Sequence, residues 1–184
     1  MKIIIYSLLI LCILSCKKEE VSELDKLPEY SATGSYNFGC LINGEAFIAK
    51  VYNGGWTGAK MLDIRIYNDS VKKLKIIAKQ EHKEDESLDQ KIFISVIDFQ
   101  GLGKYKLEDS LSYPSYVYPT YYEPNHNSFS STSHHVDQSK EHSITITHFD
   151  ETNKIISGWF SFSVYGANGN FTISEGRFDG RYED

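Results

Sequence analysis

Residues 156–165 read ISGWFSFSVY, and this stretch decides the fold class because hydrophobic residues alternate along it with small or polar ones. Its even-numbered hydrophobic residues are Ile156, Phe160, Phe162 and Val164, and its odd-numbered residues are Ser157, Trp159, Ser161, Ser163 and Tyr165. Successive side chains of an extended chain point to opposite faces, so a period of two is typical of a strand with one buried face. The stretch therefore predicts a β-strand whose even-numbered face packs into a core.

The segment after this strand predicts a hairpin. Residues 166–170, Gly-Ala-Asn-Gly-Asn, have turn composition, and a return strand begins at Phe171 and Ile173. Phe178 has the opposite parity, so it faces the same core only if one extra residue is inserted before it. We expect a one-residue bulge near Glu175-Gly176, because glycine tolerates the backbone geometry of a bulge.

Other short strands are predicted by the same alternation. Asn43-Gly44 lies between two apolar segments and is the clearest hairpin signal, because Asn-Gly readily adopts the positive φ angles of a type I′ turn. Further strands are expected within residues 62–67, 74–79, 92–99, 104–107 and 143–149. We expect about nine or ten antiparallel strands in a single all-β domain, a β-sandwich or a β-barrel, since both limit exposed sheet edges.

Residues 1–20 have the pattern of a bacterial lipoprotein export signal. Lys2 precedes an apolar segment, residues 3–14, which is shorter than the roughly 18–20 residues that a membrane-spanning helix needs. Ile13-Leu14-Ser15-Cys16 then matches the lipobox, where a signal peptidase cleaves before a lipidated cysteine. We expect residues 1–15 to be a signal peptide and Cys16 to attach the protein to the outer membrane of the cell envelope. Cys16 as an ordinary cysteine of the apolar segment is the alternative.

Residues 16–33 follow as a charged and polar segment. We expect the lipidated cysteine and a flexible tether there, and the all-β domain in residues 34–184. Lys18-Glu19-Glu20 resembles the surface-export signal of Bacteroidota lipoproteins, and a solvated charged linker is the alternative interpretation. Whether the domain faces the periplasm or the outside of the cell depends on this segment.

Charge and cysteine content restrict the partners and the means of stabilisation. The chain has 25 acidic and 19 basic residues, a net charge of −6, which argues against nucleic acid or anionic lipid as a general electrostatic partner. Cys40 is the only cysteine left in the domain after lipidation of Cys16, so no intramolecular disulfide is expected. We expect Cys40 to be a buried apolar side chain, with pairing between molecules as the alternative.

Motifs near both ends of the expected domain invite comparison with a known family. They are Ala32-Thr33-Gly34, Phe38-Gly39-Cys40, Asn43-Gly44, Gly158-Trp159-Phe160-Ser161-Phe162 and Glu175-Gly176-Arg177-Phe178-Asp179. In these motifs the chain resembles an uncharacterised family of Bacteroidota lipoproteins, although Trp159 stands where a small residue is expected. The resemblance implies an all-β exported lipoprotein, and the family has no assigned activity or catalytic residues.

Histidines between residues 134 and 148 form the densest group of potential metal ligands. His134, His135 and His142 are the candidate zinc ligands, but a zinc site needs three or four ligands that converge at about 2.0–2.2 Å. The spacing of these histidines matches no established metal motif. Exposed histidines in a polar loop are therefore the favoured interpretation, and no cofactor is predicted.

A tyrosine-rich segment is the candidate ligand platform. Its members are Tyr113, Tyr116, Tyr118, Tyr121 and Tyr122. Tyrosine rings offer flat apolar faces with a hydrogen-bonding tip, which suits sugars or peptide edges. Three prolines, at positions 114, 119 and 124, confine the segment to an edge strand or a surface loop. Packing of the tyrosines on an edge strand is the favoured alternative.

Two kinds of oxygen-bearing side chain complete the candidates. Ser70 and Ser110 lie in Asp-Ser-aliphatic triplets that resemble the O-glycosylation acceptor of Bacteroidota. Glu175, Asp179 and Asp98 are carboxylates of the kind used in glycoside hydrolysis, which needs two carboxyl groups about 5–9.5 Å apart. Roles in a bulge or a turn explain these residues without catalysis, and no Gly-x-Ser-x-Gly or His-Glu-x-x-His motif is present.

Together these features predict a non-enzymatic, surface-tethered binding or accessory module for a glycan or a peptide. Its membrane contact is expected through the lipid on Cys16, and nucleic acid is not expected as a partner. The alternatives are a hydrolase with an unrecognised site in the histidine-rich loop and a structural subunit of an envelope assembly.

Overall fold

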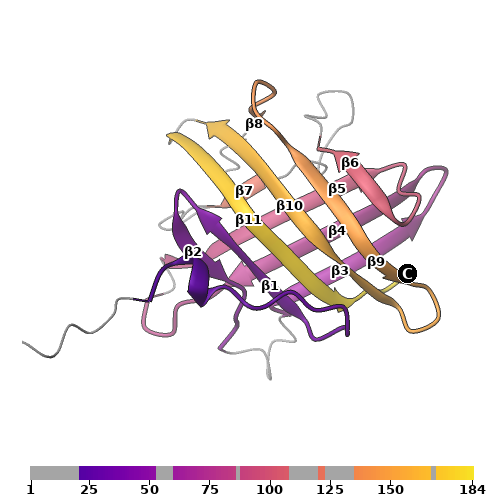
Figure 1. Ribbon diagram of the computed structural model, residues 1–184, viewed down its shortest axis with the longest axis horizontal. Helices are drawn as coiled ribbons and strands as arrows, with labels where there is room; N and C mark the ends of the chain where they lie inside the picture. The colour runs from indigo at the N-terminus through magenta and orange to yellow at the C-terminus, as the bar shows by residue number, and fades with distance from the viewer. Residues whose placement is uncertain (1–20, 53–59, 86–87, 108–119, 123–134, 167–168) are drawn as a thin grey trace, which may run out of the picture.

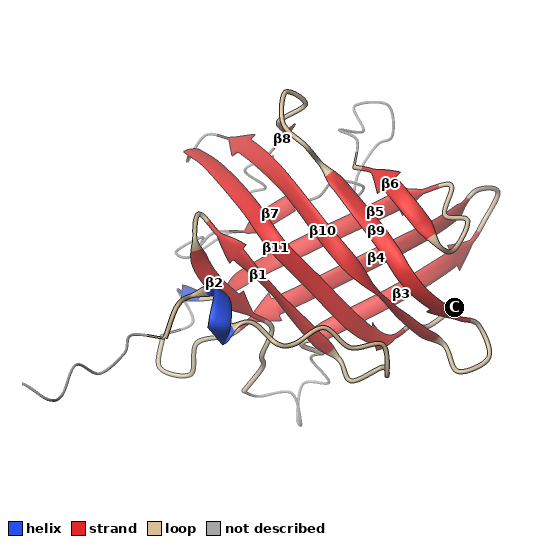
Figure 2. Ribbon diagram, in the orientation of Figure 1, coloured by secondary structure: helices blue, strands red, loops and turns tan. Residues whose placement is uncertain are grey.

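The computed structural model describes residues 21–52, 60–85, 88–107, 120–122, 135–166 and 169–184. In these residues eleven β-strands form two antiparallel sheets that lie one on the other (Figures 1 and 2). The predicted all-β fold is confirmed, and it is a sandwich, because the two sheets do not close into a barrel. Two of the strands have only three and two residues, and the nine longer ones match the expected number.

The larger sheet contains seven strands. They are β1 (Asn37–Ile42), β2 (Glu45–Ile48), β6 (Gly103–Lys106), β8 (His135–Val136), β9 (Ser143–Asp150), β10 (Ile155–Gly166) and β11 (Gly169–Arg181). Their order is β2-β1-β11-β10-β9-β6, and β8 pairs with the far end of β10. The strand pair read first in the sequence, β10 and β11, therefore lies at the centre of this sheet (Figure 1).

The smaller sheet contains four strands in the order β3-β4-β5-β7. They are β3 (Leu62–Asn68), β4 (Lys72–Gln80), β5 (Gln90–Ile97) and β7 (Thr120–Tyr122). The described residues contain one short 3₁₀ helix, η2 (Leu24–Lys26), and none of their helices is long and apolar enough to span a membrane.

The core lies between the sheets and consists of the hydrophobic rows that the alternation predicted. Ile156, Phe160, Phe162 and Val164 of β10 are all buried, and they meet the inward rows of β3, β4 and β5 in one cluster. Cys40 is completely buried in this cluster, which confirms the expectation of a small apolar side chain, and burial raises the pKa of its thiol far above the ordinary value. A buried, protonated thiol is unreactive.

The predicted hairpin and the predicted bulge are both confirmed. Asn43 and Gly44 have φ angles of 51° and 90° and connect the paired residues Ile42 and Glu45. The bulge adds one residue to β11 between its pairings at Ser174 and Arg177 with β1. The left-handed residue of the bulge is Glu175, at φ 54°, rather than the glycine. Gly176 instead leaves room for the ring of Phe160, since a Cβ atom added to Gly176 would lie 2.5 Å from Phe160 Cδ2.

The expectation of a flexible tether is wrong for residues 21–33, which pack on the outer face of the larger sheet. Leu27 is only 6% exposed. Pro28 lies against Gly39, and a Cβ atom added to Gly39 would lie 2.6 Å from Pro28 Cδ. Tyr30 stacks on Trp159 with ring centroids 4.8 Å apart. The segment is mostly polar, but these few apolar contacts order it, so the folded domain includes residues 21–33 as well as residues 34–184. We refer to residues 21–35 as the N-terminal strap.

Two isolated parallel bridges join the sheets at different corners of the sandwich. Lys50, just after β2, pairs with Gln80 at the end of β4. Glu183, just after β11, pairs with Arg65 of β3 through hydrogen bonds of 2.9 and 2.8 Å. The second bridge covers the outer edge of β3, which would otherwise present unpaired backbone groups.

Candidate functional site

The inward rows of three strands change from apolar to polar at one corner of the sandwich. On β4 the buried row Leu74, Ile76 and Ala78 continues to Gln80, and on β5 the row Val96, Ile94 and Ile92 continues to Gln90. On β2 the row continues from Ala49 and Phe47 to Glu45. Because side chains alternate along a strand, these three polar residues extend the core positions beyond the end of the core.

A cleft of about 460 Å³ opens at this corner, and we call it the corner cleft. It is lined by Ile42, Asn43, Glu45, Ala46, Phe47, Gln80, His82, Gln90 and Phe171. Its volume falls in the range of about 300–1,000 Å³ that is common for small-ligand sites. Amides, an imidazole and one carboxylate therefore surround an apolar floor.

The glutamines at the cleft lie side by side, because Gln80 and Gln90 are paired in the register of β4 and β5. Gln80 Oε1 accepts a hydrogen bond from the backbone N–H of Ile48 at 3.0 Å. This bond uses the amide oxygen, so the amide NH₂ is the group that Gln80 offers to a ligand. The Lys50–Gln80 bridge fixes the end of β4 at the same place.

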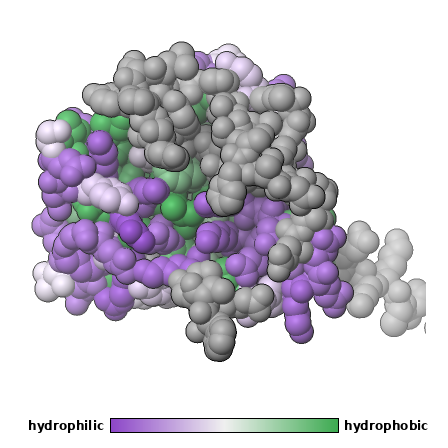
Figure 3. Space-filling view, turned by 180° about the vertical axis from the view of Figure 1, so that it is seen from behind, coloured by the Kyte–Doolittle hydropathy of each residue, from purple (hydrophilic) through white to green (hydrophobic). Residues whose placement is uncertain are grey.

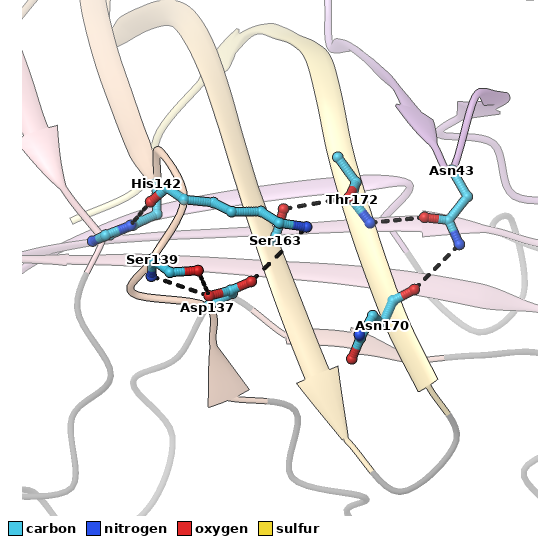
Figure 4. Close-up of polar contacts among 8 residues, drawn as sticks. Asn43, Asp137, Ser139, His142, Ser163, Asn170 and Thr172 are labelled. Atoms are coloured by element: carbon cyan, nitrogen blue, oxygen red, sulfur yellow. Dashed lines mark hydrogen bonds and ion pairs between the residues drawn. The ribbon is translucent and has the colours of Figure 1, made fainter.

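The rim of the cleft is held by the Asn43-Gly44 turn, which is fastened to β11 (Figure 4). Asn43 Oδ1 accepts from Thr172 N at 2.8 Å, and Asn43 N donates to Thr172 O at 2.9 Å. Asn43 Nδ2 also donates to the carbonyl of Asn170 at 3.4 Å. On the opposite rim, the backbone N–H of His82 donates to Asp89 at 2.7 Å. The site is therefore held by backbone contacts on both sides.

The lining combines hydrogen-bonding groups with an apolar surface. Amide and carboxylate groups form hydrogen bonds with hydroxyl groups, and the ring of Phe171 offers an apolar surface beside them. The described lining residues include no serine, threonine, cysteine or lysine, and the titratable side chains among them are Glu45 and His82. The arrangement can form hydrogen bonds with hydroxyl groups of a ligand.

The sequence pointed to other residues and missed most of this cleft. Glu45, Gln80, His82, Gln90 and Phe171 belong to no motif. A signal did exist, because Gln80 and Gln90 occupy the parity of the buried rows that precede and follow them. That signal becomes specific only when both strands are known to end at one corner.

Among the three candidate zinc ligands, only His142 has a described side chain. It is 6% exposed, its Nδ1 lies 2.5 Å from the carbonyl of Lys140, and its Nε2 has no hydrogen-bond partner (Figure 4). His134 and the side chain of His135 lie outside the described residues. Within the described part of the chain, no three histidine, cysteine or acidic side chains converge as a metal site would require. An open depression of about 390 Å³ beside His142 is lined by Lys104, Lys106, Glu141 and Ser143.

The tyrosine-rich segment contributes an edge strand, as the prolines predicted. Tyr121 and Tyr122 belong to β7, where they pair with Ile92 and Lys91 of β5, and their side chains are not described. Tyr113, Tyr116 and Tyr118 lie outside the described residues. Since Gln90 directly precedes Lys91, β7 runs along β5 next to the corner cleft.

The remaining predicted sites fall into two groups. Ser70 lies exposed in the turn between β3 and β4, as expected for a glycosylation acceptor. Cys16 and Ser110 lie outside the described residues. No chemistry of these three residues is tested by the fold.

Asp179 is a structural residue, since its carboxylate is buried under the N-terminal strap. Ser31 Oγ donates to it at 2.6 Å, and the backbone N–H groups of Thr33, Gly34 and Ser35 donate at 3.0, 2.8 and 3.1 Å. Burial by itself would raise the pKa of Asp179, but these hydrogen bonds outweigh it and hold the pKa below the ordinary value. The Ala-Thr-Gly motif and the Glu-Gly-Arg-Phe-Asp motif therefore meet in one contact, which we call the Asp179 clasp.

Comparison of the chain with protein-family models, with curated proteins and with solved structures gives no match.

Proposed function

We propose that this protein is a non-enzymatic binding module of the cell envelope, and that its corner cleft takes a short neutral glycan. The observation that carries the proposal is the change of three buried rows from apolar residues to Glu45, Gln80 and Gln90 around a cleft of about 460 Å³. A ring of hydrogen-bonding groups over an apolar floor matches the hydroxyl edges and the apolar ring faces of a sugar.

A glycan fits this corner better than a peptide strand. The usual way for a peptide to bind here would be to extend the sheet along the free edge of β2. The N–H groups of that edge are already used, because Ala46 N donates to Glu23 Oε2 at 3.0 Å and Ile48 N donates to Gln80 Oε1 at 3.0 Å. A peptide would have to displace both side chains before it gained any backbone hydrogen bond.

Replacing Gln90 with alanine should weaken glycan binding about tenfold, because the variant loses at least one hydrogen bond in a partly enclosed site. The purified protein would first be screened on an array of neutral glucan, mannan and xylan oligosaccharides. Calorimetry on the oligosaccharide with the strongest signal then compares the variant with the unchanged protein.

The matched control is Gln138→Ala, since Gln138 is an exposed glutamine of a turn between β8 and β9. It should bind the same oligosaccharide within twofold of the unchanged protein. If no neutral oligosaccharide binds, or if both glutamine variants lose the same affinity, the corner cleft is not a glycan site.

We also propose that Cys16 anchors the module by its lipid to the outer membrane, with the domain presented at the cell surface. Acyl chains contribute about 0.8 kcal/mol for each buried CH₂, so two or three chains make attachment effectively stable.

Cys16→Ser should abolish incorporation of labelled palmitate and move the protein from the membrane fraction to the soluble fraction. Cys12→Ser, a cysteine of the same export signal, should retain both label and membrane attachment. If the Cys16→Ser variant still incorporates labelled palmitate, the proposed lipid anchor at Cys16 is wrong.

A further inference from the structure

The outer face of the smaller sheet carries a concentration of positive charge. Its basic residues are Arg65 of β3, Lys73, Lys75 and Lys79 of β4, and Lys91 of β5, and we call them the lysine face. They lie on the face opposite to the buried even-numbered rows. Seen from behind, the surface that the grey atoms leave visible is mainly hydrophilic, with hydrophobic areas between (Figure 3).

The register places these like charges directly opposite one another. Lys75 pairs with Arg65 of β3, and Lys79 pairs with Lys91 of β5. Like charges at opposed positions of neighbouring strands destabilise a sheet. The pairing therefore concentrates positive charge on β4 and on the positions opposite it.

Nearby acidic groups compensate the charge only in part. Asp63 is the one acidic residue on this face of β3, β4 and β5, and Arg65 pairs with it at 3.1 Å. Among the described residues, no carboxylate is in salt-bridge contact with Lys73, Lys75 or Lys79. The pKa of Lys91 is lowered, first by burial and then by repulsion from Lys79 and Lys75.

We infer that the lysine face binds a linear anionic polysaccharide, one that carries carboxylate or sulfate groups along its length. Lys73 to Lys79 extends about 20 Å along β4, at roughly 3.3 Å for each residue, so the charges form a row that suits a linear polymer. Lys75 Nζ lies 5.1 Å from the ring centroid of Phe93, beside Ile77. Phe93 and Ile77 therefore place apolar surface between the charges of the row.

A net charge of −6 argues against a general attraction to polyanions, but it does not describe the local field over β4 and β5. A cationic face on an acidic protein directs an anionic polymer to one place and one orientation.

Two other anionic partners fit less well. The N-terminal strap packs on the outer face of the larger sheet, so a membrane attached through the strap would face away from the lysine face. A protein partner generally needs a protruding apolar or aromatic anchor at the centre of its interface. Phe93 and Ile77, the central apolar residues here, are partly buried between charged side chains.

The test uses immobilised dextran sulfate and uncharged dextran, two polymers with the same backbone that differ in charge. The purified protein should bind dextran sulfate and not dextran, and raising NaCl from 50 to 300 mM should weaken binding at least tenfold because salt screens exposed charges. Lys75→Gln/Lys79→Gln should weaken binding about tenfold, whereas Lys104→Gln/Lys140→Gln, which removes the same charge from another part of the surface, should change it less than twofold.

The inference is overturned if the unchanged protein does not bind dextran sulfate at 50 mM NaCl, or if the two double variants lose affinity equally. Stronger binding to polyglutamate or to phosphatidylglycerol vesicles than to dextran sulfate would assign the face to a protein or a membrane, and would also overturn it. Gln90→Ala should leave dextran sulfate binding unchanged, so failure at this face and failure at the corner cleft are separable.

Discussion

Replacing Asp179 with alanine should lower the free energy of unfolding by about 4 kcal/mol, because the variant leaves several buried donors without an acceptor. The carboxylate accepts from the backbone N–H groups of Thr33, Gly34 and Ser35 and from the hydroxyl of Ser31. Water cannot fully replace it, since Asp179 is only 1% exposed. The N-terminal strap should therefore detach in this variant.

Urea unfolding measures the loss of free energy, and amide hydrogen exchange locates it. Protection should be lost first at Thr33, Gly34 and Ser35, whereas the centre of β10 keeps its protection. Asp150→Ala is the matched control, because Asp150, at the end of β9, accepts from the backbone N–H groups of Thr152 and Asn153 through solvent-exposed hydrogen bonds. It should cost no more than about 1 kcal/mol. Equal costs for the two variants would contradict the clasp.

The Asp179 clasp also predicts how stability depends on pH. The pKa of Asp179 is lower in the folded protein than its ordinary value of about 3.9, so the clasp contributes fully above that value. The contribution is lost as the pH falls through the folded-state pKa, because the neutral acid is a poorer acceptor. Asp179→Asn should flatten this part of the acid unfolding curve below about pH 4.

Truncation after Arg181 should cost about 4 kcal/mol and promote aggregation, because three residues both bury an aromatic ring and cover a sheet edge. Tyr182 is 5% exposed and stacks on Phe149 with ring centroids 5.5 Å apart. Glu183 exchanges two backbone hydrogen bonds with β3, at Ile64 and Ile66. Without these residues the edge of β3 is open to pairing with another chain.

Two substitutions separate the backbone contribution from the side-chain contribution. Glu183→Ala retains the edge pairing and loses only an exposed ion pair with Lys60, so its cost should stay below about 1 kcal/mol. Tyr182→Ala retains the edge pairing and loses the ring, so it should be destabilised without the aggregation of the truncated chain. Thermal unfolding and light scattering measure the two effects. A truncated chain that unfolds like Glu183→Ala would contradict this role.

Local features of this fold were predictable from the sequence because their signals lie within a few residues. Alternation gave the strand at 156–165, Asn43-Gly44 gave a hairpin, and the parity change before Phe178 gave the bulge. The residue responsible for the bulge was not predictable in the same way. Glu175 takes the left-handed conformation because Gly176 is needed under the ring of Phe160.

Features that depend on distant residues were not predictable. The N-terminal strap looks like a tether because Leu27 and Pro28 are isolated apolar residues in a charged segment, and their partner surface is formed by strands far along the chain. The corner cleft needs the ends of β2, β4 and β5 to be in one place. Single-sequence patterns indicate which face of a strand is buried, but they do not indicate which strands end together.

The position of β1 also has a consequence for the order of events during synthesis. β1 pairs with β11, and Ile42 and Ile173 are partners although 131 residues separate them. At roughly 5–20 residues per second, the β1–β2 hairpin waits on the order of ten seconds for its neighbour. Contacts between such distant segments also slow folding. The larger sheet therefore cannot be completed until β11 has been synthesised.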